Sequence, residues 1–170
     1  MDLKRYTHAD ARDVRSLLLN IHDVAYANDP NPFHSRERFS YFVDLWSSRE
    51  NWQCVSGWEE DGPVGYAYGS MLKPGGWWKG HQRPATIRGS VFALSELLVV
   101  PQWRGTGRAR KIHNALLESV EADIATLLVD STHRKVQALY ERWRYIKVGE
   151  AKPSDDSPLY AVMAKGLKRV

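Results

Sequence analysis

The sequence predicts an α/β (α+β) fold, in which one mixed β-sheet is flanked by helices. Its 170 residues suit one ordinary domain with a sizeable core. Hydrophobic residues make up 43% and charged residues 26%, which is typical of a folded globular chain rather than a disordered one. The apolar positions switch repeatedly between a period of two and a helical period along the chain. We therefore expect a single domain over residues 1–170.

The first elements are a strand and two amphipathic helices. Asp2–Tyr6 alternates in the manner of a strand, and Thr7 is positioned to cap a helix over about Ala9–Tyr26. The Asn, Asp and Pro residues of Asn28–Pro32 end that helix. A second helix is predicted over about Arg36–Trp46, because its aromatic and aliphatic residues fall on one face.

A hairpin and a long loop follow. Asn51–Trp58 and Val64–Ser70 are predicted strands, and the turn Glu59–Pro63 between them makes the pair antiparallel. The next segment, Met71–Ser90, is rich in Gly and Pro and is predicted to be a loop. A loop of this length inside a compact domain is usually either functional or disordered.

The rest of the chain alternates strands with helices. The predicted strands are Val91–Val100, Ala125–Val129, Tyr145–Glu150 and Leu159–Met163. The predicted helices are about Gly105–Ala122 and about Arg134–Trp143. The complete order, β-α-α-β-β-β-α-β-α-β-β, is that of a mixed α+β or α/β domain.

Composition and charge exclude several classes of protein. The 24 basic residues exceed the 20 acidic ones by only four, an excess that suits an anionic small ligand as well as nucleic acid; because the basic residues are scattered and no recognised nucleic-acid module is present, no nucleic-acid partner is expected. No apolar window is long enough to span a membrane, and the first residues lack the apolar segment of a secretory signal. Cys54 is the only cysteine, which excludes an internal disulfide and a cysteine metal cluster. We expect a cytoplasmic protein without a metal.

The most informative segment joins a strand to a helix through Pro101-Gln102-Trp103-Arg104-Gly105-Thr106-Gly107-Arg108-Ala109. A helix N-terminus presents unpaired N–H groups and the positive end of the helix dipole. The two glycines and the small alanine would let an anion approach this backbone, and the charges of Arg104, Arg108 and Arg110 favour it. The segment predicts a site for a diphosphate group, with a purely structural turn as the alternative. Its spacing matches neither a P-loop nor a dinucleotide fingerprint.

Pro101 gives a second indication of the ligand. Proline cannot donate to a sheet ladder, so it ends the strand and separates it from a neighbour. Backbone groups of Leu97, Leu98 and Val99 would then lack partners. An amide-bearing arm lying as a pseudo-strand could pair with them, and coenzyme A has both such an arm and a pyrophosphate.

These residues resemble the acyl-CoA-binding motif of the GNAT superfamily of N-acetyltransferases. That motif is a strand ending Val-x-Pro, then two residues, then Arg/Gln-x-x-Gly-x-Gly/Ala, and Leu97–Ala109 carries it. Ala138–Tyr145, with Leu139-Tyr140 on a helix that precedes a strand, is similar to the second signature of the family. The resemblance covers the whole chain. It implies a mostly antiparallel sheet with a splayed cofactor strand, and acetyl-CoA as the co-substrate.

The resemblance also implies roles for individual residues. The pyrophosphate would be held by the backbone N–H groups of Arg104, Gly105, Thr106, Gly107, Arg108 and Ala109. Leu97, Leu98 and Val99 would pair with pantetheine, and one of their N–H groups would stabilise the oxyanion that develops on the thioester oxygen. Tyr140 would be the general acid that protonates the departing thiolate, with a buried core aromatic as the alternative.

Two positions depart from the family pattern. His133 stands where the family usually has an asparagine that contacts the cofactor, and a histidine ring can still donate one hydrogen bond. Arg144 stands where the family usually has glycine. If the backbone there needs a positive φ, an arginine costs about 1–2 kcal/mol.

Glu96 is the candidate base that removes a proton from the acceptor ammonium. It lies on the cofactor strand and would share a face with Leu98 and Val100, and apolar neighbours can raise a carboxyl pKa toward neutrality. A structural role for Glu96, with ordered water as the base, is the alternative.

Candidate acceptor-binding residues lie in the segments that border the substrate pocket in this family. Tyr26 and Asp29 follow the first helix, and their ring and carboxylate would suit a cationic amine. Trp77 and Trp78 are predicted to form a substrate lid, with packing or a dimer contact as the alternative.

Together these features predict an enzyme that moves the acetyl group of acetyl-CoA to a primary amine of a small molecule by direct attack in a ternary complex. Cys54 is far in sequence from both motifs, so no cysteine nucleophile is invoked. The alternatives are a protein N-terminal or lysine acetyltransferase, a non-catalytic acyl-CoA-binding sensor and a basic nucleotide-binding domain. A homodimer, common in the family, is a further expectation.

Overall fold

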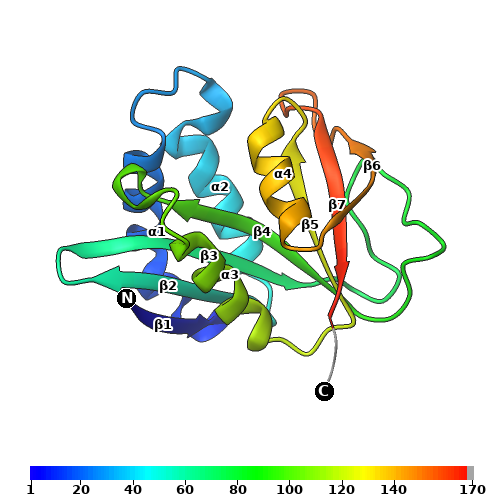
Figure 1. The fold of residues 1–170 in the computed structure, drawn as a ribbon, viewed down its shortest axis with the longest axis horizontal. Helices are drawn as coiled ribbons and strands as arrows, with labels where there is room; N and C mark the ends of the chain where they lie inside the picture. The colour runs from blue at the N-terminus through cyan, green and yellow to red at the C-terminus, as the bar shows by residue number, and fades with distance from the viewer. Residues whose placement is uncertain (168–170) are drawn as a thin grey trace. The chain divides into compact units, whose positions relative to one another are not determined.

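A computed structural model describes residues 1–167, which form a seven-stranded sheet and four α-helices (Figure 1). The strands are β1 (Asp2–Thr7), β2 (Gln53–Glu59), β3 (Gly62–Met71), β4 (Val91–Val99), β5 (Ile124–Asp130), β6 (Ile146–Ala151) and β7 (Tyr160–Gly166). The helices are α1 (Ala11–Ala25), α2 (Arg36–Ser47), α3 (Arg108–Glu118) and α4 (Arg134–Arg142). The strand order is β1-β2-β3-β4-β5-β7-β6, with β4 and β5 parallel. The predicted mixed, mostly antiparallel α+β fold is confirmed.

The contacts divide the chain into two compact units. The first contains Met1–Ser70 and Leu94–Val120, and the second contains Met71–Ala93 and the chain from Glu121 onward. Strand β4 contributes to both, because the division falls between Ala93 and Leu94. Its ladder with β5 runs from Val91↔Ile124 to Ala93↔Thr126, within the second unit. The later part of β4 is attached to β3 of the first unit, where the Val100 N–H donates to the Val64 carbonyl at 2.9 Å.

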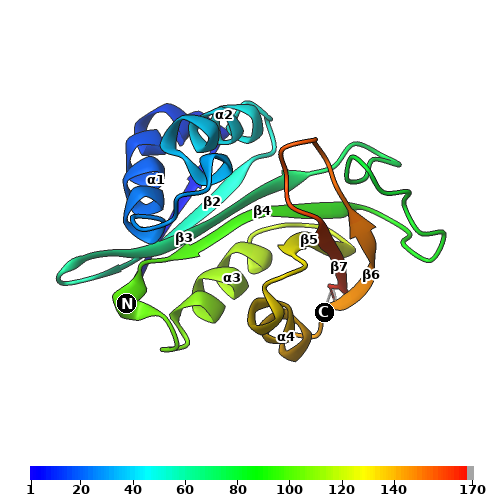
Figure 2. The same cartoon turned by 90° about the horizontal axis from the view of Figure 1, so that it is seen from above.

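The first unit has α1 and α2 on one face of its strands and α3 on the other (Figure 2). Strands β1, β2 and β3 form an antiparallel meander, and the predicted hairpin between β2 and β3 is confirmed. The core beneath α1 and α2 combines aliphatic and aromatic side chains. It includes Val14, Leu18, Ile21, Phe39, Val43, Trp52, Cys54, Tyr66, Tyr68, Leu98 and Val100.

The starts of α1 and α2 follow from their capping residues. Thr7 donates its backbone N–H to the Asp10 carboxylate at 2.8 Å, and this closes a short 3-10 turn that precedes α1. Thr7 therefore caps that turn, and α1 itself begins at Ala11, slightly later than predicted. At α2 the Ser35 hydroxyl accepts the Arg38 N–H at 3.1 Å, as an N-cap serine should.

Helix α3 is shorter than predicted at both ends. The segment from Gly105 to Gly107 is not helical, because both glycines have positive φ (72° and 79°), and the helix begins at Arg108. Its last residue is Glu118 rather than Ala122. There the Ser119 hydroxyl donates to the Leu116 carbonyl at 2.7 Å, so a side chain takes over one of the carbonyls that a helix end leaves unpaired.

The second unit is built on β5, β6 and β7. Strand β7 lies between the other two and pairs antiparallel with both. The Thr126 hydroxyl of β5 is buried and donates to the Met163 carbonyl of β7 at 2.8 Å. Helix α4 lies against one face of these strands (Figures 1 and 2). The predicted long loop is present between β3 and β4.

Helix α4 ends in a Schellman motif. The Tyr145 N–H donates to the Tyr140 carbonyl at 3.0 Å, and the Arg144 N–H donates to the Glu141 carbonyl at 2.9 Å. The motif needs a left-handed residue after the helix, and Arg144 fills that position with φ 72°. The left-handed backbone at the position where the family usually has glycine is therefore present, occupied by an arginine.

Within residues 1–167, no helix is both long enough and apolar enough to cross a membrane.

Candidate active site

The turn between β4 and α3 has the backbone of an anion-binding loop. A 3-10 turn over Pro101–Trp103 is followed by Gly105 and Gly107, both left-handed, and Gly107 is the N-cap of α3. A Cβ placed on either glycine would meet no atom within 4 Å, so the space over this backbone is open. The first N–H groups of α3 have no acceptor inside the helix and face the same end. The pyrophosphate site predicted at Arg104–Ala109 requires such an open backbone.

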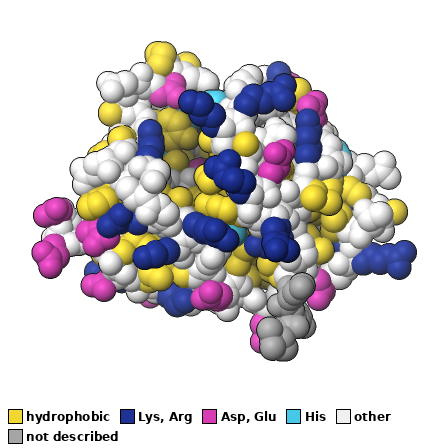
Figure 3. Space-filling model, in the orientation of Figure 1, with side chains coloured by type: hydrophobic (Ala, Val, Ile, Leu, Met, Phe, Trp, Pro, Cys, Tyr) yellow, Lys and Arg dark blue, Asp and Glu magenta, His cyan; other side chains and the backbone are white. Residues whose placement is uncertain are grey.

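The arginine side chains of this turn differ in their contacts and exposure. Lys and Arg side chains are visible over α3, whose sequence supplies Arg108, Arg110 and Lys111 (Figure 3). The Arg108 guanidinium binds the Glu59 carboxylate at 2.7 and 2.8 Å and lies 4.1 Å from the centre of the Trp103 ring. It holds the pKa of Glu59 below its usual range. The Arg108 side chain is thus fixed by protein groups, whereas Arg110 is exposed.

Arg104 also uses its side chain within the first unit. Its Nε donates to the Val99 carbonyl and its Nη2 donates to the Ala25 carbonyl, both at 3.2 Å. Ala25 is the last residue of α1. The sequence suggested that Arg104 would add charge for a phosphate; in the structure its guanidinium connects β4 to the end of α1.

The backbone of Leu97–Val99 offers fewer groups to pantetheine than the sequence suggested. The Leu98 carbonyl lies against β3, where a Cβ on Gly65 would be 2.1 Å from its oxygen. The Val99 carbonyl is occupied by Arg104. Because backbone groups alternate along a strand, the Leu97 carbonyl and the Val99 N–H point away from β3, whereas the Leu97 N–H is bonded to the Glu96 carboxyl. These are the groups left for a pantetheine arm.

Glu96 is half-buried beside two buried tyrosines. It shares its strand face with Leu98, which packs in the core beneath α1 and α2 with Tyr66 and Tyr68. Desolvation raises the pKa of Glu96 to about 7, although the Leu97 N–H opposes that shift. Burial, with the Glu96 charge as the next cause, raises the pKa of both tyrosines well above the usual value. Glu96 is therefore a carboxyl group that can exchange a proton near neutral pH.

The predicted acceptor residues at the end of α1 are held by aromatic and polar contacts. The Tyr26 ring lies between the rings of His22 and His34, at centroid distances of 4.6 and 4.7 Å. The Asp29 carboxylate is bound by His34 Nδ1 at 2.8 Å and by the Asn31 N–H at 2.8 Å. Tyr26 remains a candidate wall of an acceptor site, whereas the Asp29 carboxylate organises its own loop.

Tyr140 is buried in the second unit, at 8% exposure. Its ring meets those of Trp143 and Tyr145 edge-on, at centroid distances of 5.3 and 5.5 Å. Tyr145 is also the residue whose N–H closes the Schellman motif on the Tyr140 carbonyl, so both backbone and ring of Tyr140 are fixed. His133 precedes α4 as its N-cap, and its side chain is exposed.

Trp77 and Trp78 are half-buried in the loop of the second unit. The Trp78 indole N–H donates to the buried Thr126 hydroxyl at 2.9 Å, and that of Trp77 donates to His81 Nδ1, also at 2.9 Å. The Arg83 guanidinium donates to carbonyls of the same loop, those of Ile87, Gly76 and Gly89. These contacts favour the packing alternative over a mobile lid.

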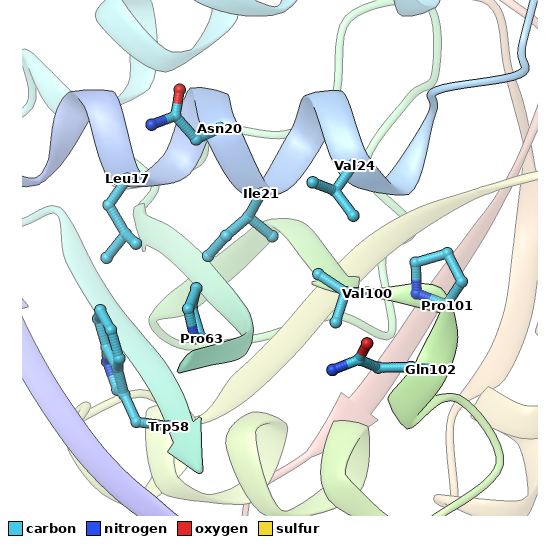
Figure 4. Close-up of a pocket in the computed structure, with 9 residues that line it drawn as sticks. All are labelled: Leu17, Asn20, Ile21, Val24, Trp58, Pro63, Val100, Pro101 and Gln102. Atoms are coloured by element: carbon cyan, nitrogen blue, oxygen red, sulfur yellow. The ribbon is translucent and has the colours of Figure 1, made fainter. Parts of the chain in front are cut away.

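A separate groove of about 560 Å³ runs along α1 in the first unit (Figure 4). It is mainly apolar, and its lining residues are Leu17, Asn20, Ile21, Val24, Trp58, Pro63, Val100, Pro101 and Gln102. None of the predicted catalytic residues is among them.

Sequence reasoning missed three residues of this site: Glu59, Tyr66 and Tyr68. Tyr66 and Tyr68 are two apart on a predicted strand, so the sequence did place them on one face. Their nearness to Glu96 depends on the pairing of β3 with β4, which a single sequence does not reveal. Glu59 lies in a predicted turn, and nothing in the sequence there indicated that its carboxylate would bind Arg108.

Comparisons with known proteins agree with this geometry. The sequence profile described as "Acetyltransferase (GNAT) family" matches residues 18–144. A search of curated proteins finds no significant sequence match.

Solved acetyltransferase structures share the fold at low sequence identity. An aminoglycoside 6'-acetyltransferase type Ii has 15% identity and a TM-score of 0.66, with all of both chains covered (100% each). The PaiA N-acetyltransferase of Thermoplasma acidophilum, in complex with coenzyme A, has 10% identity and a TM-score of 0.58, covering 98% of this chain and 100% of that one. NAA60 of Arabidopsis thaliana, in complex with a bisubstrate analogue, has 11% identity and a TM-score of 0.64, covering 97% and 98%.

Proposed function

Because the chain belongs to the acetyltransferase (GNAT) family, we propose that it transfers the acetyl group of acetyl-CoA to a primary amine of a small molecule. The transfer is direct, within a ternary complex of protein, acetyl-CoA and amine. The glycine turn between β4 and α3 carries this proposal, since its open left-handed glycines and unpaired helix N–H groups suit a pyrophosphate. PaiA, which shares the fold, was solved with coenzyme A.

The proposed chemistry assigns a base to the acceptor ammonium and an acid to the departing thiolate. Acetyl-CoA, when bound, supplies the thioester. The Glu96 carboxylate accepts a proton from the acceptor ammonium, and its pKa of about 7 suits a base at neutral pH. An N–H of the Leu97–Val99 backbone stabilises the negative charge that develops on the thioester oxygen as the N–C bond forms. The Tyr140 hydroxyl donates a proton to the sulfur as the C–S bond breaks, and the second proton that the nitrogen loses on becoming an amide returns to the tyrosinate through solvent.

Cys54 supports direct transfer rather than an acetyl-cysteine intermediate. It is 1% exposed, and burial raises the pKa of its thiol far above neutrality. A buried neutral thiol is a poor nucleophile.

Ligand binding gives the first test. Thermal unfolding is measured with acetyl-CoA, coenzyme A, ATP and NAD at equal concentrations. A ligand at about 100 times its Kd adds about 2.7 kcal/mol, and both CoA species should raise the Tm by several degrees while ATP and NAD do not. An equal shift with ATP would reduce the turn to a generic phosphate site.

Catalysis is tested by following thiol release from acetyl-CoA. Tyr140→Phe should lower kcat by about 10²–10⁴-fold with the KM for acetyl-CoA unchanged, as expected on loss of a general acid. Tyr145→Phe is the matched control, because it removes a phenol hydroxyl from the same aromatic cluster and should retain turnover. Equal turnover by wild type and Tyr140→Phe would favour the acyl-CoA sensor or another acid.

The acceptor is identified by a screen in the same assay. Small primary amines, free amino acids and peptides with unmodified N-termini or lysines are compared at equal concentration. Turnover of peptides alone would replace the small-molecule proposal with a protein acetyltransferase.

A further inference from the structure

Arg104 belongs to the glycine turn, which is proposed to bind coenzyme A, and its side chain contacts the end of α1, which is proposed to bind the acceptor. Its own backbone enters the glycine turn, with φ −66° and ψ 148° immediately before Gly105. Its side chain reaches 79 residues back along the chain to the Ala25 carbonyl. A second bond to the Val99 carbonyl fixes the direction of the guanidinium.

The Ala25 carbonyl is a group that needs such a partner. The last four carbonyls of a helix receive no hydrogen bond from an N–H within the helix, and α1 ends at Ala25. The His22 carbonyl accepts the Tyr26 N–H at 2.9 Å, and the Tyr26 carbonyl accepts the Asp29 N–H at 3.0 Å. The Arg104 guanidinium caps the carbonyl between these two turns. Its positive charge also complements the negative end of the helix dipole.

The end of α1 carries the candidate acceptor residue. Tyr26 follows Ala25 directly, and its ring is positioned by His22 and His34. Tyr26 is also close enough to Tyr66 to contribute to the raised pKa of that phenol, which Glu96 influences more strongly. The groove of Figure 4 gives separate evidence that the last turn of α1 and the start of the glycine turn are close. Val24 of α1 and Pro101 of the turn both line its wall.

We infer that Arg104 is a positioning residue that couples coenzyme A binding at the glycine turn to the acceptor side of the site at the end of α1. The inference rests on the proposed function. A pyrophosphate that orders the backbone of Arg104–Gly107 also orders the guanidinium that caps α1, so cofactor binding tightens the turn that presents Tyr26. By linkage, an amine that binds against an ordered Tyr26 strengthens cofactor binding by the same factor.

Hydrogen–deuterium exchange tests this coupling without a known amine, with coenzyme A as the probe. The amides of Tyr26 and Asp29 report on the end of α1, because both donate in the turns that close it. In the wild type, coenzyme A should slow their exchange at least about fivefold. In Arg104→Gln it should still raise the Tm but leave this exchange unchanged. Arg104→Lys should be intermediate, since a lysine lacks the fork that reaches two carbonyls.

Arg110→Gln is the matched control. It removes the same charge from the exposed first turn of α3, so it should weaken coenzyme A binding while retaining the slowed exchange at the end of α1. Once an amine is known, Arg104→Gln should raise the KM for the amine severalfold at saturating acetyl-CoA and, by the same linkage, raise the KM for acetyl-CoA by a similar factor at saturating amine.

Four other results would contradict the inference or the proposed function. Equal slowing in the wild type and Arg104→Gln overturns the inference, as does a wild type that binds coenzyme A without slowing at α1. Loss of coenzyme A binding in Arg104→Gln would make Arg104 a phosphate ligand instead. A wild type that shows no Tm shift with coenzyme A contradicts the proposed function itself.

Discussion

Replacing Arg144 with glycine should stabilise the protein. Arg144 has φ 72° in the Schellman motif after α4, and its side chain is exposed. A left-handed backbone costs a residue with a Cβ about 1–2 kcal/mol, which glycine avoids. Glycine returns about 0.4–1 kcal/mol of this through the greater entropy of the unfolded chain. The net gain is about 0.5–1 kcal/mol, or a rise of about 1–4 °C in Tm for a chain of this length.

The assay is thermal and urea unfolding of three variants. Arg144→Ala keeps the left-handed strain and removes only the side chain, so it should resemble the wild type. Arg142→Gly places glycine in the last helical turn of α4 and should lose about 0.5–1 kcal/mol. If Arg144→Gly is no more stable than Arg144→Ala, the strain argument fails.

Three further predictions concern titration and packing. The contribution of Glu96 to the free energy of unfolding, taken as the difference between the wild type and Glu96→Gln, should fall as pH rises from about 4.5 to about 7, because the folded state holds the Glu96 proton more tightly than the unfolded state; Glu96→Gln should also abolish the acid limb of the kcat/KM profile near pH 7. His22 acts in the opposite direction, since burial lowers its pKa from 6.5 to about 4: its contribution to the free energy of unfolding, taken as the difference between the wild type and His22→Phe in urea unfolding at both ends of this range, should fall as pH drops. Trp78→Phe removes the hydrogen bond to Thr126 and part of the packing of the half-buried ring, so it should cost at least about 1 kcal/mol and leave the amine KM unchanged; a raised KM with unchanged stability would restore the lid.

Much of the fold could be predicted because local signals agreed with the final structure. The alternation in Asp2–Tyr6 and the turn residues of the β2–β3 hairpin gave the correct elements, and the glycines between β4 and α3 indicated a turn there. The start of α3 was placed too early for a local reason. Arg108 and the residues before it are equally polar, and only the φ angles of Gly105 and Gly107 set the boundary.

The side-chain partners of the site could not be predicted, since they join distant parts of the chain. Arg104 and Arg108 are chemically equal neighbours of the glycines, yet one binds Ala25 and the other binds Glu59. Trp78 shows the same limit: a tryptophan in a Gly- and Pro-rich loop suggested a lid, and its indole binds a buried threonine of β5. Such pairings depend on strand order, which no single segment encodes.

Two kinds of glycine in this chain should differ in how much their positions vary among orthologues. Gly75, in the loop between β3 and β4, has room around it but a left-handed backbone, so residues that tolerate that backbone, such as asparagine, are acceptable replacements there. Gly65 has the reverse constraint: any side chain would collide with the Leu98 carbonyl of the neighbouring strand. Glu96 lies two residues before Leu98 on the same strand, so β3 can accept a larger residue at position 65 only by moving the strand that holds the proposed base. Orthologues should therefore vary at the first position and remain invariant at the second.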